Sequence, residues 1–185
     1  MESWKIAQSI VGTSEGRPEN DFYPTPPSIT QALLDVEKLS SCVWECACGE
    51  GDMSRVLLDN GYKVHSTDLI DRGYGIGERD FLQEDVILAP SIVTNPPFKL
   101  AIQFMEHALY DLGADKLALF AKLSFLEGQR RTAKLMVSPL KNVHVFRSRQ
   151  TLTRRGEKSR NGGMIAFAWY VWEHGYEGKP QIFWI

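Results

Sequence analysis

The tetrapeptide Asn95-Pro96-Pro97-Phe98 carries the residue types with the clearest chemical potential in this chain. An asparagine side-chain oxygen and a nearby backbone carbonyl can accept both N–H groups of one exocyclic amine. These hydrogen bonds draw the nitrogen lone pair out of conjugation, so the amine becomes a better nucleophile. Two prolines fix the backbone at little entropic cost on binding, and Phe98 offers a ring on which a planar substrate stacks. The pattern predicts chemistry at an amino nitrogen, and a base within a duplex would have to flip out to reach it.

A second cluster lies in the stretch 44–52, "WECACGEGD", where Gly49 and Gly51 fall between an expected strand and an expected helix. Glycines at such a turn let a ligand approach the backbone closely. The stretch does not fit the dinucleotide-binding G-x-G-x-x-G pattern, because Ser54 occupies the third glycine position. Glu45, just before the turn, would also repel a pyrophosphate. An acidic strand end suits a ligand with a positive ammonium group instead.

Two aspartates follow at the ends of later elements. Asp68 ends the next expected strand, where its carboxylate can accept both hydroxyls of a ribose, and Asp80 can accept a hydrogen bond from an adenine amino group. Leu69 and Phe81 are placed to flank the adenine ring. Each feature taken alone has a structural explanation, such as an aspartate helix cap or a rigid loop that packs Phe98 into the core. Their order and their placement at strand ends favour ligand binding.

Apolar periodicity predicts the elements that must position these residues. Helices are expected at 25–39, 52–61, 100–113 and 127–137, and strands at 42–46, 62–68, 91–95, 116–123, 142–146, 164–172 and 181–185, with a further short strand within 71–82. Strands that alternate with helices predict an α/β fold with a doubly wound, mostly parallel sheet. No helical pattern separates 142–146 from 164–172, so an antiparallel strand is expected near one edge. Ligands bind at the carboxyl ends of such strands, where both motifs fall.

Composition narrows the class of protein. A chain of 185 residues fits one domain with a full core, and residues 1–20 lack periodicity and are expected to form an arm. No apolar run approaches the roughly 20 residues of a membrane helix. The N-terminus lacks the features of a signal peptide, so we expect a cytoplasmic protein. The odd, clustered cysteines Cys42, Cys46 and Cys48 argue against a disulfide framework, and without a second set of ligands we expect no metal site.

The stretch 147–160 concentrates positive charge in a chain whose net charge is −2. It joins two late strands, and it is expected to lie near the sheet edge that carries the tetrapeptide. We therefore expect Arg149, Arg154, Arg155 and Lys158 to contact nucleic-acid phosphates. The alternative is a solvated connecting loop, which is how most charge runs behave.

The chain resembles the Rossmann-like class I methyltransferases that use S-adenosylmethionine, above all the DNA adenine N6-methyltransferases. Their catalytic N/D-P-P-Y/F tetrapeptide is matched by residues 95–98. The stretch "AKLSFLEGQRR" followed by "AFAWYVW" is similar to small proteins of this kind from bacteriophages and prophages. The resemblance covers residues 21–185 and implies a single methyltransferase domain with no separate target-recognition domain. Target recognition would then come from loops, a partner or a second subunit, as in a homodimer.

The resemblance also implies site residues and an activity. Tyr23 and Thr25 would lie near the methionine carboxylate of the cofactor. The full set of expected cofactor-binding residues is Tyr23, Thr25, Glu45, Ala47, Gly49, Gly51, Asp68, Leu69, Asp80 and Phe81. The implied reaction is methylation of N6 of adenine in DNA. The alternatives are methylation of an RNA adenine, N5-methylation of a protein glutamine, and a non-catalytic nucleic-acid-binding or host-defence decoy module.

Overall fold

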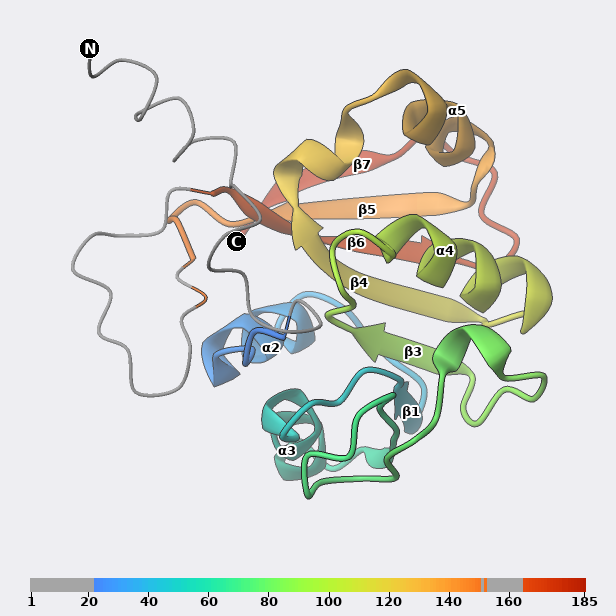
Figure 1. Ribbon diagram of the computed structural model, residues 1–185. Helices are drawn as coiled ribbons and strands as arrows, with labels where there is room; N and C mark the ends of the chain where they lie inside the picture. Colours follow the sequence, from blue (N-terminus) through green and yellow to red (C-terminus); the bar gives the residue numbers. More distant parts are fainter. Residues whose placement is uncertain (1–21, 151, 153–164) are drawn as a thin grey trace, which may run out of the picture.

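A seven-stranded sheet forms the centre of the molecule (Figure 1). The computed structural model describes residues 22–150, 152 and 165–185. The strands stand in the order β2-β1-β3-β4-β6-β5-β7. Their bounds are Cys42–Glu45 (β1), Lys63–Ser66 (β2), Ser91–Thr94 (β3), Lys116–Lys122 (β4), Leu140–Val145 (β5), Phe167–Glu173 (β6) and Gln181–Trp184 (β7).

The directions of the strands confirm the expected sheet. Strands β2, β1, β3 and β4 pair in parallel, and β7 pairs in parallel with β5. Strand β6 lies between β4 and β5 and is antiparallel to both. The sheet is therefore mostly parallel with one antiparallel strand toward an edge. As a result, the carboxyl ends of β1, β2, β3 and β4 meet along one border of the sheet.

Helices cover both faces of the sheet, as a doubly wound fold requires. The bounds are Pro27–Leu34 (α2), Asp52–Asp59 (α3), Ala101–Glu106 (α4) and Gln129–Val137 (α5), with 3₁₀ turns at Phe81–Gln83 (η2) and Leu123–Leu126 (η4) and a π-helical turn at His107–Asp111 (η3). Within β4, Leu117 belongs to the same buried cluster as Met105 of α4, whereas Phe120 belongs to a second cluster with Leu33 of α2. Among the described residues, no helix has the length and apolar character that crossing a lipid bilayer takes.

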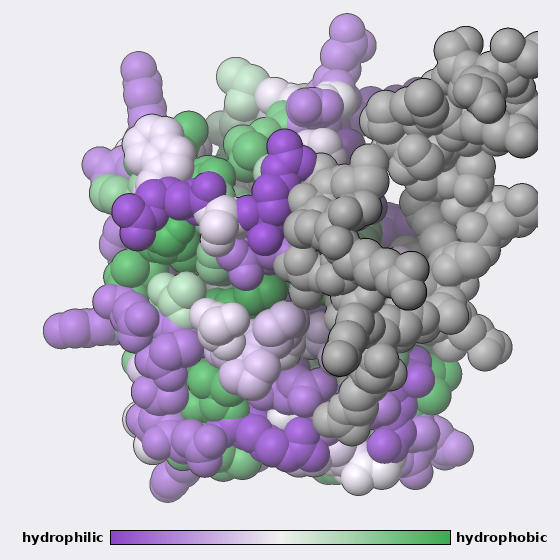
Figure 2. Space-filling model, turned by 90° about the vertical axis from the view of Figure 1, so that its left-hand side faces the viewer, coloured by the Kyte–Doolittle hydropathy of each residue, from purple (hydrophilic) through white to green (hydrophobic). Residues whose placement is uncertain are grey.

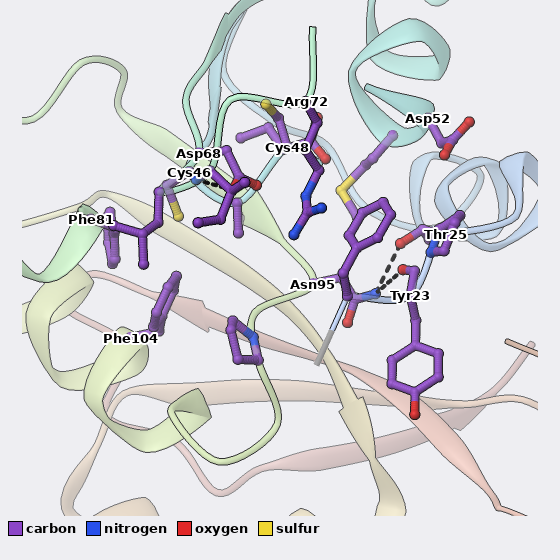
Figure 3. Close-up of a pocket in the computed structure, with 18 of the residues that line it drawn as sticks. Tyr23, Thr25, Cys46, Cys48, Asp52, Asp68, Arg72, Phe81, Asn95 and Phe104 are labelled. Carbon is purple, nitrogen blue, oxygen red and sulfur yellow. Dashed lines mark hydrogen bonds between the residues drawn. The ribbon is translucent and has the colours of Figure 1, made fainter. Parts of the chain in front are cut away.

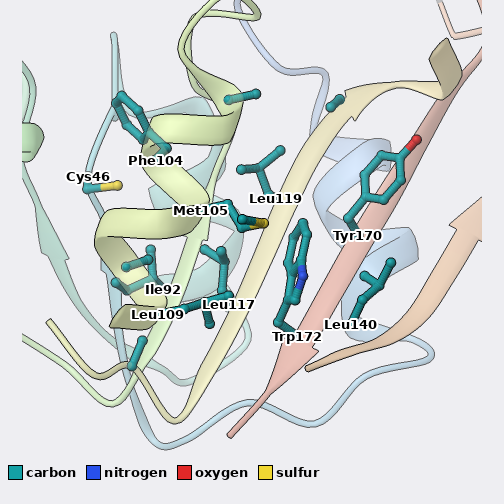
Figure 4. Packing of buried hydrophobic residues seen from close by; sticks show 14 of the residues in the cluster. Cys46, Ile92, Phe104, Met105, Leu109, Leu117, Leu119, Leu140, Tyr170 and Trp172 are labelled. Carbon is teal, nitrogen blue, oxygen red and sulfur yellow. The ribbon is translucent and has the colours of Figure 1, made fainter. Parts of the chain in front are cut away.

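The apolar stripe of α4 fixes the helix that follows the tetrapeptide. Phe104 and Met105 are buried against Ile92 of β3 and Leu117 of β4 (Figure 4). This spacing of apolar residues gives a helix one face that packs on the sheet. Because β3 and α4 are both locked in the core, the turn between them, which holds residues 95–98, is anchored at both ends.

The segment 71–82 differs from the expectation of a short strand. It forms one isolated bridge, between Thr67 and Ile76, and then the η2 turn. Gly73 and Gly75 adopt positive φ angles of 78° and 68°, a conformation that an extended strand does not contain. The segment is therefore a loop that borders the carboxyl ends of β1 and β2.

A buried polar cluster ties the opposite border of the sheet together. Glu37 accepts hydrogen bonds from His144 Nε2 at 2.8 Å, Asn142 Nδ2 at 2.6 Å and Lys116 Nζ at 3.3 Å. Burial alone would raise the pKa of Glu37, but these hydrogen bonds and the Lys116 charge lower the pKa to about 2. The cluster joins the segment after α2 to the amino end of β4 and to β5.

Candidate active site

A pocket opens at the border where β1, β2 and β3 end (Figure 3). It encloses about 790 Å³ of space between atoms, its open mouth included. Its walls are formed by expected cofactor residues together with others: Phe22, Tyr23, Pro24, Thr25, Glu45, Cys46, Ala47, Cys48, Asp52, Met53, Asp68, Leu69, Ile70, Arg72, Asp80, Phe81, Asn95, Pro97, Leu100 and Phe104. Figure 2 looks onto this border of the sheet, where hydrophobic side chains are interspersed among hydrophilic ones.

Asp68 is held rigidly at the end of β2. Its Oδ2 accepts a hydrogen bond from the Gly49 backbone N–H and its Oδ1 accepts one from the Ile70 N–H, each at 2.8 Å. A carboxylate oxygen has a second lone pair, so each oxygen retains acceptor capacity for a ligand hydroxyl. Asp68 thus joins the glycine turn to the β2 end and presents a fixed pair of acceptors to the pocket.

The glycines of the turn serve close packing of aromatic rings. Gly49 and Gly51 have positive φ angles of 56° and 82°, and neither residue lines the pocket. A Cβ at Gly49 would lie 2.3 Å from the Phe22 ring, and one at Gly51 would lie 2.4 Å from the Tyr74 ring. The turn therefore requires glycine for its backbone conformation and for these two rings. Ala47 and Cys48, which come just before the two glycines, line the pocket instead.

Glu45 lies at the floor of the pocket and is 2% exposed. Its Oε2 accepts a short hydrogen bond from Ser54 Oγ, and that hydroxyl lies 2.6 Å from Ser66 Oγ. Burial, with a smaller contribution from the nearby Asp52 and Asp68 charges, raises the pKa of Glu45 to about 8. Most of this carboxyl is therefore protonated at pH 7, and a cation placed in the pocket would favour its ionisation.

The amide of Asn95 has a defined orientation. Its Nδ2 donates to Thr25 Oγ1 at 3.0 Å and to the Tyr23 carbonyl at 3.5 Å (Figure 3). No described residue donates a hydrogen bond to its Oδ1. Thr25 and Tyr23 are expected cofactor residues, and the structure places their polar atoms against the amide of the tetrapeptide. The side-chain oxygen of Asn95 is thereby left to accept hydrogen bonds from another molecule.

Phe98 lies beside the pocket without lining it. Its ring stacks at 6.1 Å on Tyr23, lies 5.8 Å from Phe167 and has Lys122 Nζ at 4.9 Å from its centroid. Pro96 is buried, and Pro97 alone of the two prolines faces the pocket. The tetrapeptide is thus wedged between the pocket and an aromatic cluster on the α2 face.

The expected adenine-binding residues gather at one end of the pocket. Asp80 lines it and also caps the η2 turn, because its Oδ1 accepts the Leu82 N–H at 3.0 Å. Phe81 is buried, with its ring 4.8 Å from that of Phe104. Leu69 is 55% exposed at the rim. The structural and the ligand-binding roles of Asp80 are therefore compatible.

Arg72 is a pocket residue that the sequence analysis did not identify. Its guanidinium lies 4.2 Å from the centre of the Phe22 ring, and Figure 3 shows it directed into the pocket. Its Nε is buried without a hydrogen-bond partner among the described residues. Nothing in the glycine-rich sequence around Arg72 signals this placement, because it depends on the path of the loop.

The pocket thiols are not nucleophiles at neutral pH. Burial raises the pKa of Cys46 well above its ordinary value and that of Cys48 to about 12. A thiolate, and not a thiol, carries cysteine chemistry. Cys46 and Cys48 therefore act as small apolar wall residues.

The basic stretch is described only in part. Arg149 is exposed on the segment that follows β5. Arg154, Arg155 and Lys158 lie outside the described residues. The structure leaves the expected phosphate contacts of this stretch as a prediction.

Comparison with known proteins identifies the fold. No model of a known protein family matches the sequence, and no curated protein sequence matches it. Among solved structures, the modification subunit of a proposed type I restriction enzyme from Vibrio vulnificus YJ016 superposes with a TM-score of 0.63 and 13% identity over 98% of this chain, which spans only 50% of that subunit.

Two further structures cover most of both chains. A proposed RNA methyltransferase from Pyrococcus horikoshii gives a TM-score of 0.62 with 13% identity, over 92% of this chain and 98% of that one. The 23S rRNA methyltransferase ErmE gives a TM-score of 0.61 with 15% identity, over 83% of this chain and 70% of that one. The sheet order, its antiparallel strand and these superpositions together give the chain the class I methyltransferase fold.

Proposed function

We propose that this protein transfers a methyl group from S-adenosylmethionine to an exocyclic amino nitrogen, with N6 of adenine in DNA as the first candidate acceptor. The observation that carries the proposal is the Asn95 amide, oriented by Thr25 and Tyr23 at the wall of an acidic pocket. The class I fold supports methyl transfer. The similar structures described as a restriction-enzyme modification subunit and as RNA methyltransferases support a nucleic-acid acceptor, with an RNA adenine as the second candidate.

The pocket residues fit the chemistry of this cofactor. S-adenosylmethionine carries a sulfonium, an ammonium, a carboxylate and a ribose diol, and when bound it supplies an electrophilic methyl group. Four carboxyl side chains, from Glu45, Asp52, Asp68 and Asp80, suit its cations and its hydroxyl and amino donors. Arg72, the one cation among the described residues that line the pocket, would pair with the carboxylate.

The chain's own residues would position and activate the acceptor. Asn95 Oδ1 and a backbone carbonyl of the tetrapeptide would accept the two N–H groups of the amine. These contacts hold the amine lone pair toward the pocket, where alignment of donor and acceptor supplies most of the rate enhancement. No dedicated base is required, since the amine can lose its proton to water after transfer.

Removing the Asp68 carboxylate is expected to weaken cofactor binding. The loss of a charge-assisted hydrogen bond costs about 1.5–3 kcal/mol, so the Kd of Asp68→Ala for S-adenosylmethionine should rise about 10- to 100-fold. Isothermal titration calorimetry measures the affinity. The matched control is Asp59→Ala, which removes an exposed carboxylate at the end of α3, outside the pocket. Equal affinity in wild type and Asp68→Ala would show that Asp68 only supports the glycine turn.

Thr25→Val separates two roles for the Thr25 hydroxyl. If Thr25 acts by positioning Asn95, loss of one neutral hydrogen bond should lower kcat about 2- to 10-fold. The Kd for S-adenosylmethionine should then stay unchanged. Single-turnover methylation combined with cofactor titration gives both quantities. A raised Kd with a normal kcat would show that Thr25 instead binds the methionine carboxylate of the cofactor, the role that the sequence resemblance implies.

A further inference from the structure

A second concave surface, here called the basic groove, runs between the start of α4 and the N-terminal part of α5. It encloses about 1100 Å³ of space between atoms, its open side included. Four of its ten lining residues are cations, and none is an aspartate or a glutamate. The cations are Lys99, Arg130, Arg131 and Lys134.

The basic groove begins at the tetrapeptide. Pro97 lines the acidic pocket and the next residue, Phe98, lines the basic groove. The two concave surfaces therefore lie on either side of one rigid turn. Lys122, whose Nζ is 4.9 Å from the centre of the Phe98 ring, adds a further positive charge beside this junction.

The two surfaces have opposite charge. Four carboxyl residues and one cation line the pocket, whereas cations alone supply the charge that lines the basic groove. The chain as a whole has a net charge of −2, so this concentration of cations is a local feature. An acidic pocket suits a cationic cofactor, and a basic groove suits a polyanion.

Two of the groove cations have no competing partner in the described part of the chain. Lys134 pairs with Glu106 at 2.6 Å, and Arg131 donates to the Glu127 carbonyl at 2.9 Å. Lys99 and Arg130 are exposed and make no ion pair or hydrogen bond with described residues. Their charges are therefore available to an anion in solution.

We propose that the basic groove binds the phosphate backbone of the nucleic-acid strand whose base reaches Asn95. This inference rests on the proposed function and names the surface that its acceptor occupies. Phosphates would contact Lys99 and Arg130, and the side-chain amides of Gln103 and Gln129 offer donors and acceptors to sugars and bases. Because these contacts go mainly to phosphates, they give affinity with little sequence preference.

A salt series of binding isotherms tests the groove. Fluorescence anisotropy with a labelled single-stranded DNA that contains adenine gives the slope of log affinity against log salt. Each lost phosphate contact lowers the magnitude of that slope by about 0.7 for a single strand, so the double variant Lys99→Gln, Arg130→Gln should lose about 1.4. The control variant Lys63→Gln, Lys179→Gln removes two exposed cations outside the basic groove and should match wild type.

A charge reversal gives a second measurement. Lys99→Glu combined with Arg130→Glu should weaken binding of DNA and of an RNA of the same sequence more than the glutamine variant does. Both changes lie on exposed side chains, and thermal denaturation checks that the fold is kept. Affinity for S-adenosylmethionine should remain that of wild type, because neither residue lines the pocket.

The outcomes separate this inference from the proposed function. Parallel salt plots for wild type and the groove variants would show that the basic groove does not bind phosphates. If wild type still methylates DNA, the proposed function stands. A reduced slope in Arg154→Ala, Arg155→Ala with no change in the groove variants would likewise overturn the groove in favour of the 147–160 stretch. Methyl transfer to a protein glutamine without any nucleic-acid binding would overturn both the groove and the adenine assignment.

Discussion

Asn95→Ala is expected to lower kcat for methyl transfer by on the order of 100-fold or more, with the Kd for S-adenosylmethionine close to that of wild type. In wild type, Asn95 Oδ1 would stabilise the acceptor amine as positive charge develops on it. Loss of one such preorganised group typically lowers kcat by about 100-fold or more. The Kd should hold because the Asn95 amide bonds to Thr25 and Tyr23, and Asp68 and Glu45 remain in place. Incubation with labelled cofactor and pools of DNA, RNA and protein measures transfer and identifies the acceptor.

Asn95→Asp is the matched control for this prediction. It keeps an acceptor oxygen of the same reach but loses the N–H donor to Thr25 Oγ1, so activity should lie between that of wild type and that of Asn95→Ala. Normal turnover by Asn95→Ala on the true acceptor would refute the assignment. Cofactor binding by a wild type that transfers methyl groups to none of the pools would favour the non-catalytic alternative.

Much of the fold follows from patterns that act over short range. The run "KLALFAK" is apolar on both faces, which is typical of a central strand, and it forms β4. The missing helix between 142–146 and 164–172 correctly indicated that β6 is antiparallel. The segment 71–82 was harder, because its glycines permit positive φ angles that no local pattern reveals. Ile76 supplies a strand-like residue there, but it makes a single bridge.

The site is less predictable because its contacts join residues far apart in the chain. The Asn95–Thr25 hydrogen bond spans 70 positions, and Arg72 reaches the pocket only through the path of its loop. The sequence indicates glycines at the turn, but it does not indicate that Phe22 and Tyr74 occupy the space beside them. The basic groove is equally hard to predict, because the fold and not sequence proximity brings α5 close to the tetrapeptide.

Glu45 couples the chemistry of the pocket to the stability of the fold. Its position at the end of β1 was expected from the sequence, but its burial and its hydrogen bond from Ser54 Oγ were not. Burial of a carboxyl disfavours its charged form, which is why the pKa of Glu45 rises from 4.5 to about 8. An unfolded chain has no such burial, so the two states bind different numbers of protons between these pH values.

Glu45→Gln is expected to remove a large pH dependence of stability. Between the unfolded pKa of 4.5 and the folded pKa of about 8, the native protein holds a proton that the unfolded chain has lost. The stabilisation is complete below pH 4.5 and is lost as pH rises through 8, at about 1.4 kcal/mol per pH unit. From pH 5 to pH 8, the free energy of unfolding of wild type should fall by about 3–4 kcal/mol relative to the variant, because the slope flattens near both pKa values. Urea denaturation at several pH values measures it, with exposed Glu177→Gln as control.

The same carboxyl should make cofactor binding depend on pH in the opposite sense. A cationic ligand beside Glu45 favours its ionised form, so binding near pH 7 should release a proton, and affinity for S-adenosylmethionine should rise toward pH 8 by up to about tenfold per unit. Calorimetry in buffers of different ionisation enthalpy counts the released proton. Glu45→Gln cannot ionise, so its affinity should be flat over this range and lower than that of wild type at pH 8. Identical pH profiles for cofactor affinity in the two proteins would place the cation elsewhere in the pocket, nearer Asp52 or Asp80, and Glu45 would then be a buried structural carboxyl.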